Sequence, residues 1–235
     1  MESSLEWVNE DEGMLKVFLQ GREQAQFQVF VLGEEEAELK LVSPEIVETT
    51  KKTDNVQKKI ISRMTDCILE CFLQMWNRGY NETSLVEQKG TKFAKILDSI
   101  PVVQHRYSEY MMQCSLVKQQ SFLYNSDKLK LTENEDSISC ENEDGSFFCR
   151  LIPYASQQEG ERIFYLYEVE VDRKKRNRGI ATACLTELFK RLAADAAVTV
   201  YLQVGSYNEP AVHLYEKLGF RVSEELCYYT PEEAE

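Results

Sequence analysis

Residues 171–181 read Val-Asp-Arg-Lys-Lys-Arg-Asn-Arg-Gly-Ile-Ala and join two segments of different pattern. The preceding segment, Ile163–Val171, has the composition of a strand. The following segment, Ile180–Leu192, has apolar residues at the three-to-four spacing of a helix. The stretch therefore predicts a strand-to-helix corner, with five positive charges in the six positions 173–178.

This corner has the features of an anion-binding site. A helix N-terminus presents unpaired backbone N–H groups with a partial positive charge. Gly179 has no side chain, so a ligand can approach those amides closely, and the basic run supplies countercharge for phosphates. A solvated basic turn or a nuclear-localisation-like cluster would explain the charge but not its position. The stretch matches neither a Walker loop nor a GxGxxG fingerprint.

A second motif lies further along the chain, where residues 208–220 read Asn-Glu-Pro-Ala-Val-His-Leu-Tyr-Glu-Lys-Leu-Gly-Phe. Pro210 suits the first turn of a short helix and Gly219 suits its end. The mostly apolar run Val198–Val204, just before this motif, predicts a buried strand. The C-terminal half thus predicts a mixed α/β sheet.

The two motifs together resemble those of a known family. Residues 176–181 are similar to the R/Q-x-x-G-x-G/A motif of the GNAT superfamily N-acetyltransferases, and residues 208–220 to its N-x-x-A-x-x-L-Y-x-x-x-G-F element. The resemblance covers about residues 135–235. It implies a GNAT-like α/β fold, with a mixed, mostly antiparallel twisted sheet flanked by helices, and acetyl-CoA as cosubstrate. We expect the GNAT core over residues 119–235 and an N-terminal α/β region of unknown role over residues 1–118.

The resemblance also implies roles for individual residues. The cofactor-binding residues that it implies are Val169, Val171, Arg176, Arg178, Gly179, Ile180, Ala181, Thr182 and Asn208. In such enzymes the loop amides hold the pyrophosphate, and pantetheine pairs with the strand backbone at Val169 and Val171. Tyr215 would protonate the departing thiolate, with core packing as its alternative role. Asn208 could also cap its helix.

A general base must accept a proton from the amine, and two carboxylates are candidates. Strict alternation along Ile163–Val171 places Glu168 and Glu170 on one face, close to the cofactor loop. Glu168 is the first candidate for base or acceptor anchor and Glu170 the second, with plain solvent exposure as the alternative. Where acetyltransferases of ribosomal-protein N-termini commonly have a glutamate, this sequence has Gln203. A neutral amide cannot take a proton, so this difference weighs against a protein N-terminus as substrate.

The N-terminal region predicts additional hairpin and helical structure. Residues 25–32 and 37–42 predict a β-hairpin, and residues 54–79 a helix whose apolar stripe includes Cys67 and Cys71. These thiols are expected in the core. A second helix is expected over residues 85–97, whereas residues 104–118 are ambiguous and would fit a third helix. The region could belong to one expanded GNAT fold or be a separate, degenerate GNAT-like half.

The net charge and the counts of cysteine and histidine indicate which classes of partner and cofactor to expect. The net charge of -13 disfavours nucleic acid and anionic membranes and would attract a cationic small molecule. Seven scattered cysteines without a CxxC pair, and only two histidines, argue against a metal site or a disulfide framework and favour the cytoplasm. The oligomeric state is not fixed, and a homodimer is compatible with the sequence.

The sequence therefore predicts an acetyl-CoA-dependent N-acetyltransferase that acts on a primary amine of a small molecule by direct attack in a ternary complex. An acetyltransferase for a protein or peptide amine remains an alternative. So does a noncatalytic acetyl-CoA-binding regulatory protein, although Asn208 and Tyr215 are both present.

Overall fold

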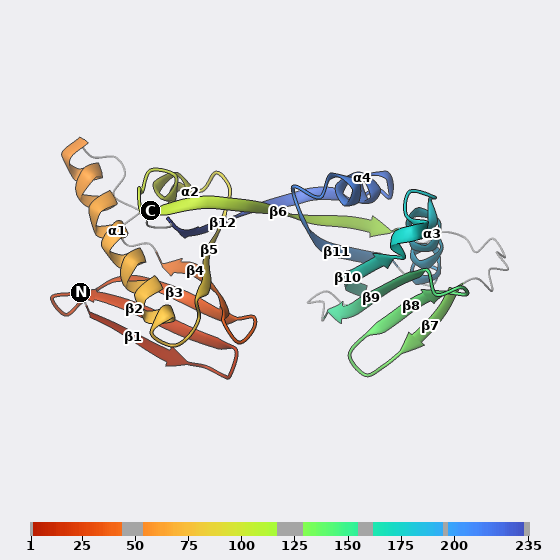
Figure 1. Ribbon diagram of the computed structural model, residues 1–235, viewed down its shortest axis with the longest axis horizontal. Helices are drawn as coiled ribbons and strands as arrows, with labels where there is room; N and C mark the ends of the chain where they lie inside the picture. The colour runs from red at the N-terminus through yellow and green to blue at the C-terminus, as the bar shows by residue number, and fades with distance from the viewer. Residues whose placement is uncertain (1, 44–53, 117–128, 155–161, 195–196, 233–235) are drawn as a thin grey trace. The chain divides into compact units, whose positions relative to one another are not determined.

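The computed structural model describes residues 2–43, 54–116, 129–154, 162–194 and 197–232. The chain divides into two compact units, of which unit 1 contains residues 1–108 and 226–235 and unit 2 contains residues 109–225 (Figure 1). Strands β6 (Val103–Leu116) and β12 (Arg221–Pro231) contribute residues to both. Among the described residues, no helix has the length and apolarity that crossing a membrane requires.

In its described residues, unit 1 is a sheet with two helices. Its strands follow the order β1-β2-β3-β4-β5-β12, and its further elements are β1 (Glu2–Trp7), β2 (Glu12–Leu19), β3 (Arg22–Val31), β4 (Glu36–Ser43), α1 (Asp54–Trp76), β5 (Glu82–Gln88) and α2 (Lys92–Leu97). The pairs β1–β2, β2–β3 and β3–β4 are antiparallel, whereas β4 and β5, joined through α1, are parallel. This β4–α1–β5 crossover is the characteristic connection between parallel strands.

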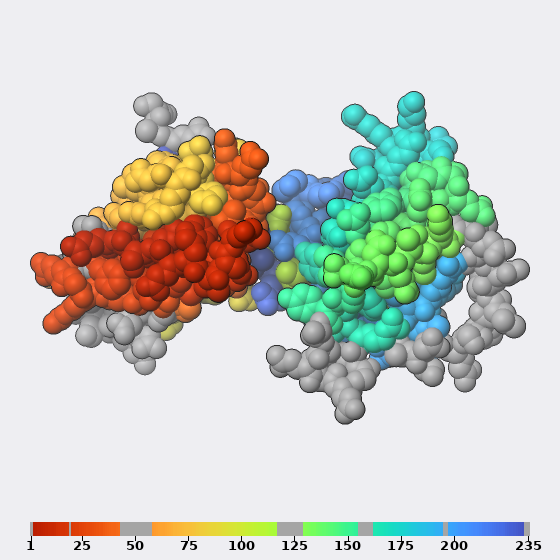
Figure 2. Space-filling view, turned by 90° about the horizontal axis from the view of Figure 1, so that it is seen from below, coloured from red at the N-terminus to blue at the C-terminus, as the bar shows by residue number. Residues whose placement is uncertain are grey.

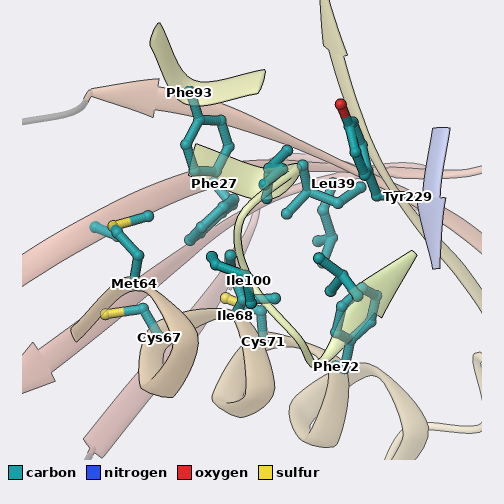
Figure 3. Close-up of a cluster of buried hydrophobic side chains, with 14 of the residues drawn as sticks. Phe27, Leu39, Met64, Cys67, Ile68, Cys71, Phe72, Phe93, Ile100 and Tyr229 are labelled. Atoms are coloured by element: carbon teal, nitrogen blue, oxygen red, sulfur yellow. The ribbon is translucent and has the colours of Figure 1, made fainter. Parts of the chain in front are cut away.

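The core of unit 1 lies between α1 and the sheet. The helix presents Cys67, Cys71 and Phe72 to sheet residues such as Phe27 and Leu39, and these five side chains are all buried (Figure 3). The two thiols therefore pack as small apolar groups, as expected.

The strands of unit 2 are arranged and connected in the same order as those of unit 1. Its strands follow the order β7-β8-β9-β10-β11-β6, and its further elements are β7 (Leu129–Glu133), β8 (Ile138–Asn142), β9 (Phe147–Tyr154), β10 (Arg162–Val171), the 3-10 turn η2 (Arg173–Lys175), α3 (Ile180–Leu192), β11 (Val198–Gly205) and α4 (Glu209–Lys217). Strands β10 and β11 are parallel and joined through α3, as β4 and β5 are through α1. Helix α3, cyan in Figure 2, lies against the green strands at the surface of this unit. Unit 1 repeats this topology, although residues 44–53, at the position that corresponds to the basic loop, lie outside the described residues.

Most sequence-based expectations for the elements are confirmed. The hairpin of β3 and β4, the helices α1, α3 and α4, and the strands β10 and β11 occur where the patterns placed them. The helix expected over residues 85–97 is confirmed only in its second part, as α2, whereas residues 85–88 belong to β5, which pairs with β4 and β12. The ambiguous residues 104–116 form part of strand β6, which pairs with β11. Pairing with distant strands outweighed local helix preference in both places.

Candidate active site

The basic stretch forms a tight corner between β10 and α3. Asp172 Oδ1 accepts a hydrogen bond from the backbone N–H of Lys174 at 2.9 Å, and Arg176 Nε donates to the carbonyl of Val171 at 3.0 Å. Asn177 and Gly179 both have left-handed backbone conformations, with φ of 60° and 76°. Such conformations cost little for glycine and are tolerated by asparagine. The sequence thus turns the chain sharply enough to start a helix directly after the loop.

The first turn of α3 has exposed amides. Gly179 is its N-cap residue and contributes no side-chain cap, while its carbonyl accepts from Ala183 N at 3.0 Å. The N–H groups of the first helical residues have no partner within the helix itself. A Cβ added to Gly179 would meet no heavy atom within 4 Å, so the space beside this residue is open. An anion can therefore approach the start of the helix.

A groove with a volume of about 530 Å³ runs from this corner to helix α4. Of the predicted cofactor residues, eight line it: Val169, Val171, Arg176, Gly179, Ile180, Ala181, Thr182 and Asn208. Tyr215 lines it as well. Arg178, the remaining predicted residue, is exposed and is not part of the lining. One groove thus joins residues from a strand, a loop and two helices.

Strand β10 contains a bulge that corrects the predicted alternation. Tyr167 pairs with Arg150 and Glu170 with Phe148, so β10 has one more residue than β9 between these rungs. Glu168 lies in the bulge with φ of 52°. Beyond a bulge the alternation is offset by one residue. Glu168 and Glu170 therefore do not continue the face of the buried residues Phe164 and Leu166, as strict alternation had predicted.

Val169 and Val171 take that face instead. Both pack against the same apolar cluster as Phe164 and Leu166, and both line the groove. The two glutamates are exposed and do not line it. Glu168 forms an ion pair with Arg150 at 3.4 Å, and Arg150 also donates to the hydroxyl of Tyr167 at 3.3 Å.

The sheet opens next to the bulge. The parallel ladder between β10 and β11 extends from the pair Arg162–Val198 to the pair Tyr165–Tyr201. Both strands continue beyond this last rung, to Val171 and Gly205. Backbone groups of β10 beyond Tyr165 are therefore outside this ladder, and an extended ligand could pair with them from the groove.

Helix α4 brings Asn208 and Tyr215 to the groove. Asn208 is the N-cap, and its Oδ1 accepts from Ala211 N at 3.4 Å, a long bond that leaves the amide available for a second contact. Tyr215 is buried, and burial, with a smaller effect of Cys149, raises its pKa to about 12. The phenol is therefore protonated throughout the physiological pH range and can act as a hydrogen-bond donor.

Sequence reasoning missed several groove residues, among them Lys175, His213 and Lys217. Lys175 Nζ lies 2.9 Å from Asp144 Oδ2 in the β8–β9 turn. Hydrogen bonds from Ser146, and in second place from Lys175, hold the pKa of Asp144 well below its usual range. Lys175 belongs to the basic run, which made it detectable in principle. Its attachment to Asp144 depends on the fold and had no sequence signal.

On the other face of the sheet, Gln203 has a partner that the sequence did not indicate. Gln203 Nε2 donates a hydrogen bond to Oε2 of Glu109, which lies on the neighbouring strand β6. Burial, and in second place the charge of Glu109, raises the pKa of Tyr165. A carboxylate is therefore present beside the neutral amide, although it comes from a distant part of the chain.

The residues described by the structure include no group of three or more His, Cys, Asp or Glu side chains that could hold a metal ion. The cysteines are all free thiols.

Comparisons with known proteins agree with this architecture. Residues 112–220 match the model of the acetyltransferase (GNAT) family. Mycothiol acetyltransferase from Corynebacterium kroppenstedtii is 34% identical over 80 residues, which are 34% of this chain and 22% of the relative. The match therefore spans only about a fifth of that relative's length.

Solved structures resemble nearly the whole chain. A GCN5-related N-acetyltransferase from Sphaerobacter thermophilus has a TM-score of 0.57 and 12% identity, with 95% of this chain and 81% of that chain covered. A tandem GNAT protein from the clavulanic acid biosynthesis pathway has a TM-score of 0.52 and 8% identity, with 97% and 86% covered. At these identities the likeness concerns the fold.

Proposed function

Because residues 112–220 form a GNAT acetyltransferase domain, we propose that this protein is an N-acetyltransferase that transfers the acetyl group of acetyl-CoA to a primary amine of a small molecule. The observation that carries the proposal is the groove that joins the open amides of α3 to Tyr215. Amine and thioester meet in a ternary complex, where positioning of the two substrates contributes much of the rate.

The corner holds the pyrophosphate of acetyl-CoA. Gly179, Ile180 and Ala181 line the groove, and so do Lys175 and Arg176. Anions at helix N-termini are stabilised by the N–H groups of the first turn and by the helix dipole. Arg178 is exposed and contributes long-range attraction. Thr182 and Asn208 complete the lining.

The thioester arm follows β10 beyond the last rung of its ladder. Pantetheine amides pair with backbone groups at Val169 and Val171, whose side chains line the groove. The N–H of Val169 polarises the acetyl carbonyl and stabilises the oxyanion that forms when the amine attacks. Tyr215 donates its hydroxyl hydrogen to the departing sulfur.

Glu168 and Glu170 attract the acceptor. Both are exposed carboxylates beside the opening of the sheet, and Glu168 is already paired with Arg150. We assign them to anchoring a cationic amine, which agrees with the net charge of -13. The free thiols of the chain favour a reducing compartment such as the cytoplasm.

Two measurements test the proposal. Titration calorimetry should detect binding of acetyl-CoA, and Tyr215→Phe should bind it too, because the phenol contributes to the chemical step. Thiol release from acetyl-CoA should then rise with at least one amine among spermidine, lysine, kanamycin and a short peptide with a free N-terminus. Absence of acetyl-CoA binding at millimolar concentration would refute the proposal. Binding without thiol release for any amine would favour a regulatory role, and activity with the peptide alone would favour the peptide alternative.

A further inference from the structure

We propose that Glu109 accepts the proton of the acceptor amine and that Gln203 positions its carboxylate at the open end of the β10–β11 ladder. The inference rests on the proposed acetyl transfer and identifies its proton acceptor. Glu109 lies outside both sequence motifs and precedes them on strand β6.

The face of the sheet on which these residues lie follows from burial along β11. Val200, Leu202 and Val204 are buried in the cluster that contains the residues of α3. Alternation places Gln203 and Gly205 on the opposite face. Directly paired residues on antiparallel strands share a face, and Gly205 pairs with Glu109. Glu109 and Gln203 therefore lie across the sheet from the helices that border the groove.

The opening between β10 and β11 connects the two faces. The opening begins after the last rung of the β10–β11 ladder, which is the pair Tyr165–Tyr201. Gln203, two residues further along β11, donates to Glu109 and draws its carboxylate toward this opening. After burial, the charge of Glu109 also contributes to the raised pKa of Tyr165. The Glu109 carboxylate is therefore close enough to influence Tyr165, the last β10 residue of the ladder, although strand β11 lies between β6 and β10. A thioester in the opening would be reached by an amine from the side of Glu109.

Gly205 and Tyr207 shape the space beside Glu109. A Cβ added to Gly205 would come within 2.6 Å of the Tyr207 ring, so the ring occupies the space that a side chain at position 205 would need. Glu109 and Gln203 are half-buried, and Tyr207 is exposed. The site is thus a half-buried carboxylate whose pairing partner Gly205 lies beside an exposed aromatic ring. Partial desolvation strengthens the interaction with a cationic amine.

The other carboxylates of this region suit proton transfer less well. Glu168 forms an ion pair with Arg150, so its carboxylate is already engaged. Glu170 is exposed and lies beyond the bulge. Glu109 accepts a hydrogen bond from the neutral amide of Gln203, which orients its carboxylate.

The proton balance of the step is complete. Glu109 takes one proton from the ammonium group, and the neutral amine attacks the acetyl carbon, so that an N–C bond forms. The C–S bond then breaks, and the sulfur receives the hydroxyl proton of Tyr215. Tyr215 regains a proton from the new amide nitrogen, and Glu109 releases its proton to water. The net products are the acetylated amine, coenzyme A and one proton.

Titratable side chains lie near Glu109 on neighbouring segments of unit 2. Tyr165 faces it from β10, and Tyr207 lies next to its pairing partner Gly205. Strand β12 lies beside this part of β6, because Ser223 Oγ donates to the carbonyl of Met111 at 3.0 Å. The next residues of β12 are Glu224 and Glu225.

The test is Glu109→Gln in the full-length protein, with spermidine or a faster amine of the panel as acceptor. Glutamine keeps the length of the side chain and an oxygen that can accept from Gln203. We expect kcat/KM to fall by about 10²–10⁴-fold, the range for loss of a general base. We also expect kcat/KM of the wild type to decrease toward acid pH and this decrease to be absent from the variant. Acetyl-CoA affinity and melting temperature should remain those of the wild type.

A matched control and a rescue variant complete the experiment. Glu133→Gln, an exposed position on β7, makes the same change of charge and should retain wild-type activity. The exchange Glu109→Gln with Gln203→Glu keeps the net charge and returns a carboxylate to the pair. It should recover activity by at least about tenfold over Glu109→Gln, together with the acid limb of the pH profile.

The outcomes separate the inference from the proposed function. Wild-type thiol release with an unchanged rate and pH profile in Glu109→Gln would overturn the inference alone. A slower variant with the wild-type pH profile and no recovery in the exchange would also overturn it, since Glu109 would then act through structure. If Glu109→Gln does not fold, the pH profile of the exchange variant decides. A wild type that acetylates none of the amines would overturn both.

Discussion

Replacing Gly179 by alanine would separate the cofactor role of the corner from its role in stability. With φ of 76°, an alanine at this position costs about 1–2 kcal/mol in the left-handed conformation. For a protein of this size that corresponds to a decrease in melting temperature of roughly 2–8 °C. The added methyl group meets no atom within 4 Å, so no clash increases this cost.

Because Gly179 lines the groove, we expect the added methyl group to weaken acetyl-CoA binding. Loss of one charge-assisted hydrogen bond to the pyrophosphate is worth about 1.5–3 kcal/mol. That is roughly a 10- to 150-fold increase in Kd, because each 1.4 kcal/mol is a factor of ten. The strain is present in both free and bound protein and does not enter this number. Titration calorimetry measures the affinity, and a thermal melt measures the stability.

Gly90 provides the matched control. It lies in the turn between β5 and α2, has φ of 82° and also has no heavy atom within 4 Å of an added Cβ. Gly90→Ala should therefore cost similar strain and leave acetyl-CoA binding unchanged. Equal affinities of the two alanine variants and the wild type would refute the assignment of the pyrophosphate to this corner.

Three further predictions concern other parts of the molecule. Tyr215→Phe should lower kcat by about 10²-fold or more. Burial raises the pKa of the Tyr215 phenol to about 12, so its ionisation should reduce the stability of the wild type only above about pH 10, where the unfolded chain releases the proton first. A series of thermal melts of both proteins across that pH range checks this. Arg178→Ala should weaken acetyl-CoA binding at low ionic strength and have little effect at 1 M salt, where the Debye length is about 3 Å, and calorimetry at both salt concentrations checks it. Cys67 and Cys71 should not react with a thiol reagent in the native protein at pH 8, because burial raises the pKa of both thiols, to about 11 for Cys67. Mass spectrometry measures the labelling, and rapid labelling of either thiol would contradict its burial.

Much of the candidate site was predictable because it is local in sequence. The corner from Val171 to Ala181 carries its own turn, its charge and its helix start, and these need no distant partner. The helix that contains Tyr215 is likewise defined by Asn208, Pro210 and Gly219 within a few residues. Local signals of this kind determine local structure, and the fold placed both segments along one groove.

The remainder depended on contacts between distant residues. The bulge at Glu168 arises from the register of β10 against β9, and a one-residue offset reverses which side chains share a face. The pair of Glu109 and Gln203 joins residues that are 94 positions apart. Residues 85–88 have apolar spacing that also fits a helix, and pairing with β4 and β12 decides that they form a strand. None of these outcomes has a signal within one short window of sequence.

The assignment of residues 226–229 to the sheet of unit 1 has a consequence for biogenesis. These residues pair with β5, yet ribosomes make them after all of unit 2. Unit 1 leaves the ribosome first, so β5 is an exposed edge strand until residues 226–229 are made. An exposed edge strand is prone to association with other chains. The final closure of unit 1 is a non-local step of the kind that folds slowly. Chaperone demand during translation should accordingly be greatest before the last strand emerges.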